Sequence, residues 1–386
     1  QAAVTRRGVG TSHAAVIGRG LGAPCIVGAS ELVIDLKRNK IVSPDGREFS
    51  VGDVITVDGT TGQVLAGAPP MLEAALDGAF GTLLSWADDF RDIGVRANAD
   101  TPADAQTAQN FAAEGIGLCR TEHMFFEGDR LGVMREMIID EEGEDRRAVL
   151  DRLLPMQRED FQRLFEIMTG KTVCVRLFDP PLHEFLPFDK AGMRDLAEQM
   201  ALPLTEVIER VNALSEYTPM LGMRGVRMGI AIPEIYDMQA RAIFEALAAV
   251  EGNGVKVNVE IMIPLVSAVR EVELMRARVD GVANAVRAKN KADFEYHLGV
   301  MVETPRGALR ARDIAEHVEF LSFGTNDLTQ MTYGLSRDDA GRFMSTYVQQ
   351  GVYEEDPFHT LDIEGVGELV SMGAERGREG RPDVIL

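Results

Sequence analysis

A histidine within a glycine-rich turn is the first side chain in this sequence that suggests a chemical role. Residues 8–28 read GVGTSHAAVIGRGLGAPCIVG, with His13 following the dipeptide Thr-Ser. Small residues from Ala14 onward allow a helix to begin there, and a helix N-terminus holds anions through its free N–H groups and its macrodipole. A phosphoryl group on His13 would be well held at such a turn, with Arg19 within reach. The alternative is an ordinary capping turn that contains a histidine.

Charged side chains also stand at the carboxyl ends of five expected strands. In chain order these ends carry Arg120 with Glu122, Arg176 with Asp179, Arg224 with Arg227, then Glu303, and finally Asp327. Guanidinium forks bind carboxylates and phosphates bidentately, and the pair Glu303 and Asp327 suits a Mg²⁺ ion that also takes substrate oxygens. The residues therefore predict a site for a small, phosphorylated anion and a divalent metal. The alternative is a set of salt-bridged surface residues.

The elements that must position these side chains occupy residues 92–386. Short apolar strands alternate there with longer helical stretches, which predicts βαβ units and a parallel sheet. The number of units favours an α/β fold of the (β/α)8 TIM-barrel type, in which the strand ends converge on one mouth. The expected strands are 94–99, 115–121, 171–178, 224–230, 257–266, 296–304 and 319–327, with a truncated eighth at 383–386, and the expected helices are 103–114, 144–169, 233–250, 267–289 and 306–316. Long connections at 122–143 and 179–222 are of the kind that carries function.

A small β-rich domain is expected before the barrel, over residues 1–68. Its short β-like runs are separated by Gly, Pro, Asp and Asn turns. These runs cover 24–28, 32–36, 39–43, 53–59 and 60–67. Residues 69–91 are helical in propensity and are expected to link the two domains.

The composition excludes several classes of function. The 386 residues carry 40 Lys and Arg against 61 Asp and Glu, a formal net charge of −21. Such an acidic chain is a poor general binder of nucleic acid or of an anionic membrane, and no apolar run approaches the length of a membrane span. Three cysteines are too few for a disulfide framework, so a cytoplasmic location is expected, with Cys119 and Cys174 as packing residues.

Several strings in the chain resemble the family of phosphoenolpyruvate-utilising enzymes. Residues 8–28 resemble the phosphohistidine motif of that family, and FGTNDLTQ at 323–330 resembles its second signature. Longer strings favour its pyruvate, phosphate dikinase branch; they are GIGLCRTEHMFF (115–126), RLFDPPLHEFLP (176–187), PMLGMRGVRMGI (219–230), PEIYDMQARAIFEA (233–246) and SFGTNDLTQMTYGLSRDD (322–339). The resemblance covers essentially the whole chain. Val9 departs from it, since it stands where the family usually has glycine.

The resemblance implies a reversible conversion of ATP, phosphate and pyruvate into AMP, pyrophosphate and phosphoenolpyruvate. A histidine on a swivelling domain carries the phosphoryl group, and the matching position is His13. The matching substrate-binding positions are Arg120, Arg176, Glu303, Gly324, Thr325, Asn326 and Asp327, of which Glu303 and Asp327 would also bind Mg²⁺. Thr11 matches a regulatory phosphorylation site served by a kinase and a phosphatase. The family also implies a homodimer that forms through the barrel.

Parts of the family's organisation are expected to lie outside this sequence. An ATP-grasp domain, which would take ATP and phosphate, precedes the histidine domain in the family, and the first part of that domain is also missing. A Cys-Gly-Glu-His segment, whose cysteine protonates the enolate, would follow Leu386. The chain alone is therefore expected not to run the full reaction. Ala substitution of Arg120 or Arg176 is expected to abolish phosphoenolpyruvate binding and leave the fold intact.

Two other interpretations of the sequence stay open. One is a phosphoenolpyruvate synthase or an enzyme I-type phosphotransferase, with a different phosphoryl acceptor. The other is a non-catalytic fragment that retains the scaffold.

Overall fold

The computed structural model describes residues 2–5, 25–35, 38–59, 61–69, 78–126, 129–139 and 143–386 of the chain. Two compact units contain them, Gln1–Thr82 and Leu83–Leu386. Across the described segments, no helix combines the length and the apolar composition that crossing a membrane requires.

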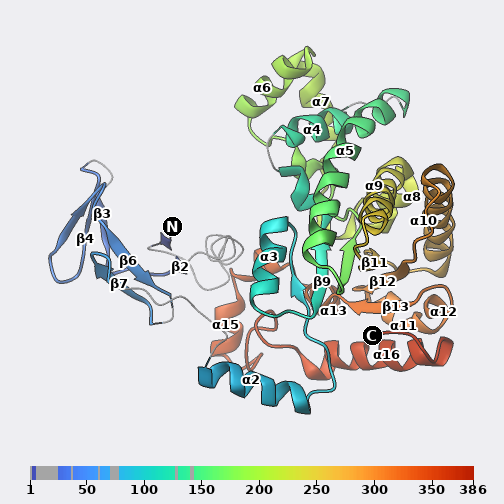
Figure 1. Ribbon diagram of the computed structural model, residues 1–386. Helices are drawn as coiled ribbons and strands as arrows, with labels where there is room; N and C mark the ends of the chain where they lie inside the picture. The colour runs from blue at the N-terminus through green and yellow to red at the C-terminus, as the bar shows by residue number, and fades with distance from the viewer. Residues whose placement is uncertain are drawn as a thin grey trace. The chain divides into compact units, whose positions relative to one another are not determined.

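The first unit is built from short strands (Figure 1). β1 pairs with β2 in parallel, β3, β4 and β5 form an antiparallel sheet, and β6 and β7 form an antiparallel pair. The strands are β1 (Ala3–Val4), β2 (Cys25–Ile26), β3 (Val33–Asp35), β4 (Lys40–Val42), β5 (Glu48–Ser50), β6 (Ile55–Asp58) and β7 (Gln63–Ala66). The expected strands of this region are confirmed, and β1 and β5 are additional. The helix α2 (Gly78–Phe90) follows, within the expected helical link.

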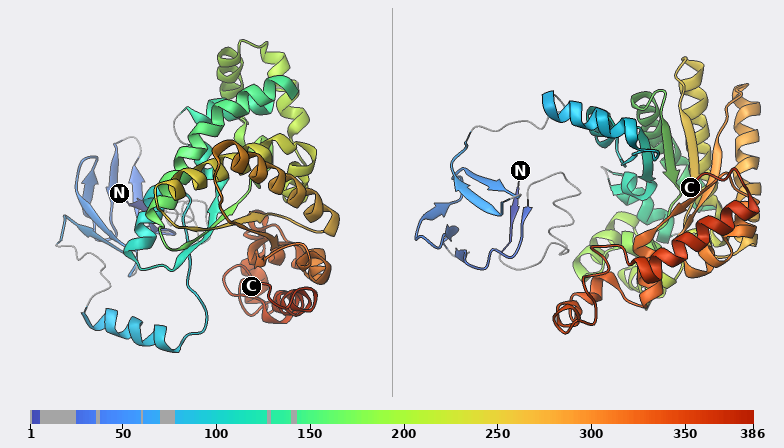
Figure 2. Two further views of the ribbon diagram at one scale, coloured as in Figure 1. Left: turned by 45° about the vertical axis from the view of Figure 1, so that its right-hand side comes forward. Right: turned by 90° about the horizontal axis from the view of Figure 1, so that it is seen from below.

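The second unit is an α/β structure around a curled, parallel, six-stranded sheet (Figures 1 and 2). Its strands lie side by side in chain order: β8 (Ala97–Asn98), β9 (Gly115–Arg120), β10 (Thr172–Arg176), β11 (Asn258–Ile263), β12 (His297–Val302) and β13 (Phe320–Phe323). Beyond β13, Ile385 makes a parallel bridge to Phe320, which is where the sequence predicts a further strand to begin. The described residues thus form a half-barrel whose strands run in the direction expected of a TIM-like domain.

The expected strand at 224–230 is wrong. Those residues lead into the short helix α8 (Val226–Ala231), which begins after Gly225. β10 pairs directly with β11 over five consecutive residue pairs, so the sheet has no position for a strand between them. Val226 and Met228 are apolar at a spacing of two, which imitates a strand, yet both are buried on a single helical turn. The strand expected at 319–327 is also shorter than predicted, since β13 ends at Phe323 and the helix α13 (Thr325–Tyr333) follows.

Helices connect the strands and pack along the sheet. The connections are α3 (Pro102–Asn110), α4 (Arg130–Ile139), α5 (Gly143–Ile167), α9 (Pro233–Gly252), α10 (Val269–Asn290), α11 (Pro305–Leu309), α12 (Ala311–Ala315) and α16 (Glu368–Gly380). The two long insertions hold α4 in one case and α6 (Lys190–Met200) with α7 (Leu204–Leu214) in the other. After α13 come α14 (Arg337–Ala340) and α15 (Met344–Gln349). The helices expected at 144–169, 233–250 and 267–289 are confirmed. The helix expected at 103–114 ends at Asn110, and the one expected at 306–316 is divided into α11 and α12.

The alternation of side chains along the strands divides the unit into an outer core and an inner face. Val173 and Val175 of β10 belong to the large hydrophobic cluster shared with the helices. Cys174 points the other way and packs in a smaller cluster with Met262, Met301 and Phe320. Because successive strand residues alternate between faces, Arg176 and Glu303, each two residues after a member of that cluster, follow it on the inner face.

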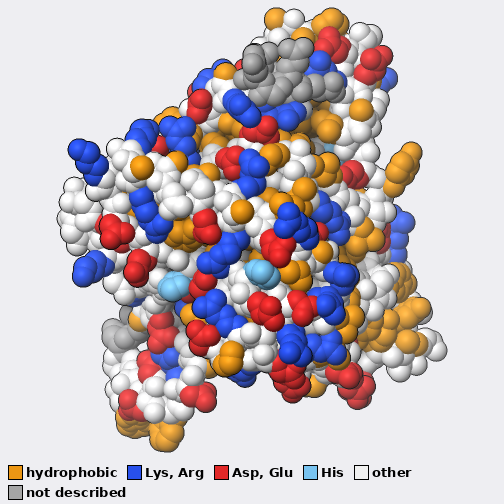
Figure 3. Space-filling view, turned by 90° about the vertical axis from the view of Figure 1, so that its right-hand side faces the viewer, with side chains coloured by type: hydrophobic (Ala, Val, Ile, Leu, Met, Phe, Trp, Pro, Cys, Tyr) orange, Lys and Arg blue, Asp and Glu red, His pale blue; other side chains and the backbone are white. Residues whose placement is uncertain are grey.

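Charges on the outer helices are interspersed and paired. On the face formed by α10 and its neighbours, basic and acidic side chains alternate (Figure 3). Arg276 of α10, for example, binds Glu319 at 2.9 Å, and Arg278 binds Asp237. Basic and acidic side chains on this face therefore largely neutralise one another.

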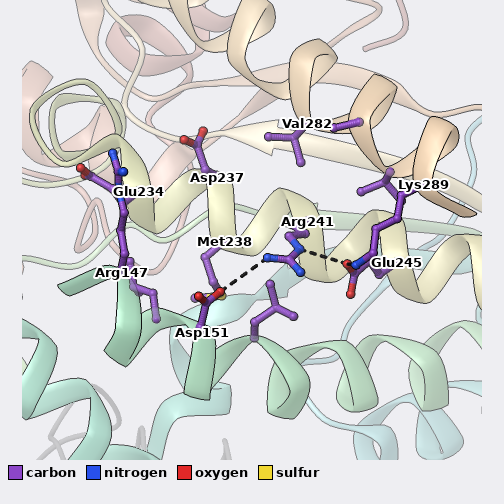
Figure 4. Close-up of a pocket in the computed structure, with 13 residues that line it drawn as sticks. Arg147, Asp151, Glu234, Asp237, Met238, Arg241, Glu245, Val282 and Lys289 are labelled. Atoms are coloured by element: carbon purple, nitrogen blue, oxygen red, sulfur yellow. Dashed lines mark hydrogen bonds and ion pairs between the residues drawn. The ribbon is translucent and has the colours of Figure 1, made fainter. Parts of the chain in front are cut away.

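A cleft of about 380 Å³ lies between α5, α9 and α10 (Figure 4). Arg241 crosses it, 3.5 Å from Asp151 and 3.0 Å from Glu245. The carboxylate of Glu245 is 6% exposed and also binds Arg158 at 2.9 Å and Lys289 at 3.3 Å. Although burial opposes it, these bonds hold the pKa of Glu245 below its ordinary value. The cleft is thus crossed by ion pairs and contains none of the site residues predicted from the sequence.

We expect Glu245→Gln to lower the free energy of unfolding by about 2 kcal/mol at pH 7, because three cations lose their shared partner. A carboxylate whose pKa is lower in the folded than in the unfolded state stabilises the folded protein at pH values above its unfolded pKa. This stabilisation is lost as the pH falls through the folded pKa. The difference between wild type and variant should therefore stay nearly constant from pH 7 to about pH 5 and shrink as the pH falls further, through the lowered folded pKa. Urea denaturation at each pH measures it. Glu159→Gln, which removes one exposed pair on α5, is the control, expected to change stability by less than about 0.5 kcal/mol; a constant difference at all pH values would contradict the prediction.

Candidate functional site

Three carboxylates meet at the carboxyl edge of the sheet. Asp179 follows β10, Glu303 follows β12, and Asp327 lies in the first turn of α13. One oxygen of each lies within 4.8 Å of an oxygen of the others. Asp179 is 3% exposed and Glu303 1%. Burial, together with the negative charges of the other two carboxylates, raises the pKa of Glu303 well above its ordinary value.

Two arginines link these carboxylates, of which Arg176 is buried and Arg224 is 11% exposed. Arg176 donates to Glu122 and lies 3.0 Å from an oxygen of Asp179. Arg224 donates to both oxygens of Asp179, at 2.5 and 3.2 Å, and lies 3.2 Å from Asp327. Burial alone would lower the pKa of Arg176, but the charges of Glu122 and Asp179 raise it, so this arginine stays a cation.

The donor set fits a hard divalent cation. The ionised forms of Glu122, Asp179, Glu303 and Asp327 and the two arginines leave a formal charge of −2 in a buried cluster. Carboxylate oxygens are the ligands that Mg²⁺ prefers, usually as one or two carboxylates completed by waters and substrate oxygens. Glu303 and Asp327, which the sequence predicts as ligands, are both present, with Asp179 as a third candidate.

Arg120 lies beside this cluster on the neighbouring strand. It is the register partner of Arg176, so both side chains leave the sheet at the same level. Its backbone N–H donates to Asp100 at 2.6 Å, and its guanidinium lies 3.6 Å from the same carboxylate. His123 also contacts Asp100, at 2.7 Å. The side chain of Arg120 is 31% exposed, in contrast to that of Arg176 at 9%.

The turn between β13 and α13 passes close to the acidic cluster. A Cβ atom on Gly324 would lie 2.8 Å from both the Cβ and an Oε of Glu303, so a side chain at that position would displace the carboxylate. Thr325 and Asn326 follow and are exposed at the start of a nine-residue helix. The N–H groups of such a helix end have no partner within the helix and favour anions. The structure thus gathers Gly324, Thr325 and Asn326 at the same edge as Glu303.

The sequence places Glu122, Asp179 and Arg224 among the charged strand ends, but it gives none of the three an individual role. What marks Glu122 and Asp179 in the sequence is their position, since each follows the end of a strand within three residues. Arg224 was expected at a strand and instead precedes α8, where the N–H of Gly225 donates to the backbone carbonyl of Asp179 at 2.8 Å.

The remaining predicted residues are two that the structure does not describe and two cysteines. His13 and Thr11 lie outside the described residues. Cys119 and Cys174 are both buried, and burial raises the pKa of each thiol. Their place in the hydrophobic clusters confirms them as packing residues.

Comparison with known proteins shows which family the sequence matches. Residues 74–381 match the model of the phosphoenolpyruvate-utilising enzyme, PEP-binding domain, and residues 1–62 match that of the phosphoenolpyruvate-utilising enzyme, mobile domain. The chain is 52% identical over 384 residues to a pyruvate, phosphate dikinase of Rhizobium meliloti, and 48% identical over 383 residues to one of Giardia intestinalis. A pyruvate, phosphate dikinase of Clostridium symbiosum is 47% identical over 380 residues.

These alignments cover 98–99% of the chain but only 43% of each relative, so the chain spans less than half the length of the curated relatives it matches. The match of the first model alone extends over most of the chain. These matches show that the chain, with its half-barrel and the charged cluster at the edge of the sheet, belongs to the family of phosphoenolpyruvate-utilising enzymes.

Proposed function

We propose that this chain provides the phosphohistidine part and the phosphoenolpyruvate-binding part of a pyruvate, phosphate dikinase. The observation that carries the proposal is the convergence of Arg120 and Arg176 with Glu303 and Asp327 at one edge of the sheet. The names of the curated relatives favour the dikinase reaction over that of a synthase or of enzyme I. The proposed parts are the phosphohistidine domain (residues 1–68), a helical link (69–91) and the barrel (92–386).

The site residues divide the work of phosphoryl transfer. Arg120 and Arg176 neutralise the phosphoryl and carboxylate oxygens of the substrate. Glu303 and Asp327 hold Mg²⁺, with Asp179 beside them, and the bound ion would polarise the carboxylate and enolate oxygens. Backbone N–H groups at Gly324, Thr325 and Asn326 give further contacts to the anion.

His13 is the proposed covalent carrier. As the phosphoryl group moves from phosphoenolpyruvate to His13, the bond between phosphorus and the enolate oxygen breaks and a bond to the imidazole nitrogen forms. This divides one transfer into two easier ones.

The rest of the reaction involves groups outside this site. We propose that ATP and phosphate react with the phosphohistidine at a separate nucleotide-binding domain. A homodimer through the barrel, a cytoplasmic location and regulation through phosphorylation of Thr11 complete the proposal.

Labelled substrate tests the assignment of His13. The chain is incubated with Mg²⁺ and phosphoenolpyruvate that carries ³²P, and we expect an acid-labile, alkali-stable label on His13. His13→Asn should remove the label, and Arg120→Ala should reduce labelling at least about 100-fold because an anion-binding guanidinium is lost. A label on another residue, or labelling that survives in His13→Asn, would overturn the proposal.

A further inference from the structure

A strained turn follows β11 and runs behind the acidic cluster. It consists of Pro264, Leu265 and Val266. Leu265 has φ = +60°, the left-handed region, although it is not glycine, and its side chain is fully buried. A left-handed backbone costs an ordinary residue of the order of 1–2 kcal/mol, and such residues concentrate at functional sites.

This conformation directs a hydrogen-bond donor at a proposed metal ligand. The N–H of Leu265 donates to Oε1 of Glu303 at 2.6 Å. One residue later, the carbonyl of Val266 accepts from the hydroxyl of Thr304 at 3.1 Å. The turn is therefore bonded to two successive residues at the end of β12, and it fixes the direction in which Glu303 points.

The other side of the turn is tied to α8. The carbonyl of Pro264 accepts from the N–H of Val226 at 3.1 Å. Gly225, at φ = +57°, packs so closely that a Cβ there would lie 2.7 Å from the Cβ of Leu265 and 3.1 Å from an oxygen of Asp179. The same turn therefore holds both Glu303 and the segment that contacts Asp179.

We propose that Leu265 is a positioning residue for the divalent-cation site, and that its left-handed backbone orients Glu303 through the N–H bond. The inference rests on the proposed function of that site. The alternative role for a buried leucine is to fill the core. The two roles differ in what they demand of a substituted residue, since positioning requires the left-handed conformation and core filling requires volume.

Two substitutions separate these demands. Leu265→Val keeps most of the volume, but β-branched residues strongly disfavour a positive φ. Leu265→Gly leaves a cavity but adopts the left-handed conformation without strain. If Leu265 positions Glu303, the valine variant should bind Mn²⁺ about 10-fold more weakly than wild type. Its Tm should nevertheless be higher than that of the glycine variant. The glycine variant should have the lower Tm but bind Mn²⁺ within about threefold of wild type.

The measurements are Mn²⁺ titration by electron paramagnetic resonance and thermal unfolding of the metal-free chain. If Mn²⁺ affinity follows Tm, so that valine binds better than glycine, Leu265 only fills the core and the inference is overturned. If circular dichroism shows the glycine variant to be unfolded, Leu265→Ala replaces it, because alanine lacks the β-branch and should bind Mn²⁺ more tightly than valine. If wild type itself binds no Mn²⁺, the proposed metal site fails and this inference fails with it; binding by wild type with the wrong ranking overturns the inference alone.

Discussion

Arg176→Ala is expected to abolish phosphoenolpyruvate binding and also to lower the free energy of unfolding by about 3 kcal/mol. The side chain of Arg176 is 9% exposed, and its guanidinium pairs with the carboxylates of Glu122 and Asp179. Its removal takes from the buried Glu122 the arginine that pairs with it, and Asp179 then keeps its pair with Arg224. Calorimetric titration with phosphoenolpyruvate and urea denaturation measure the two effects.

The sequence alone predicts that both arginine variants keep the fold, and the burial of Arg176 changes that expectation. Arg120→Ala is the matched control. Its side chain is 31% exposed and its guanidinium lies 3.6 Å from Asp100, which keeps His123 as a second partner. We expect at least about a 100-fold loss of phosphoenolpyruvate affinity, with a change in unfolding free energy below about 1 kcal/mol. Equal stability losses in the two variants, or unchanged binding in both, would show that the roles are assigned wrongly.

Glu303→Gln is expected to remove the stabilisation that a divalent cation gives to the chain. A ligand present at 100 times its Kd stabilises the folded state by about 2.7 kcal/mol, and wild type should gain this amount from Mn²⁺. Glutamine has the shape of glutamate and its carbonyl oxygen still accepts from the N–H of Leu265, so the turn behind the site is preserved. Only the negative charge is lost, and with it the affinity for the cation.

Thermal unfolding with and without Mn²⁺ checks this expectation. Glu245→Gln, a substitution in the outer cleft, is the control and should keep the full Mn²⁺-dependent rise in Tm. Phosphoryl transfer from phosphoenolpyruvate to His13 should fall about 10³-fold in Glu303→Gln, since the charge stabilisation supplied by a metal is worth several kcal/mol. A normal Mn²⁺-dependent rise in Tm in Glu303→Gln would exclude Glu303 as a ligand.

Much of the site could be predicted because it follows local rules. The period of two along a strand sets which face a side chain occupies, and parallel strands end at the same edge. Arg176 follows the inward Cys174 by two residues, and Glu303 follows the inward Met301 by two. The types and positions of Arg120, Arg176, Glu303 and Asp327 were therefore enough to predict that they lie at one edge of the sheet.

The prediction of a strand at 224–230 was wrong for a local reason. A short apolar run with a spacing of two has the same pattern in a strand and in a single buried helical turn. The direct pairing of β10 with β11 decides between them, and it joins residues more than 80 positions apart in the sequence. Such pairing is a property of the whole sheet and leaves no mark on the seven residues themselves.

The sequence by itself determined the parallel α/β architecture, the charged strand ends and the family resemblance, because these depend on residue types and short spacings. Only the tertiary structure decided that Asp179 joins Glu303 and Asp327, that Arg224 contacts Asp327 across 103 positions, and that Arg176 is a buried counter-ion. It also decided that Leu265 adopts a left-handed backbone and directs its N–H at Glu303. The physical reason is that the curl of the sheet and the backbone of one turn set these distances, and both depend on packing between segments far apart in the chain.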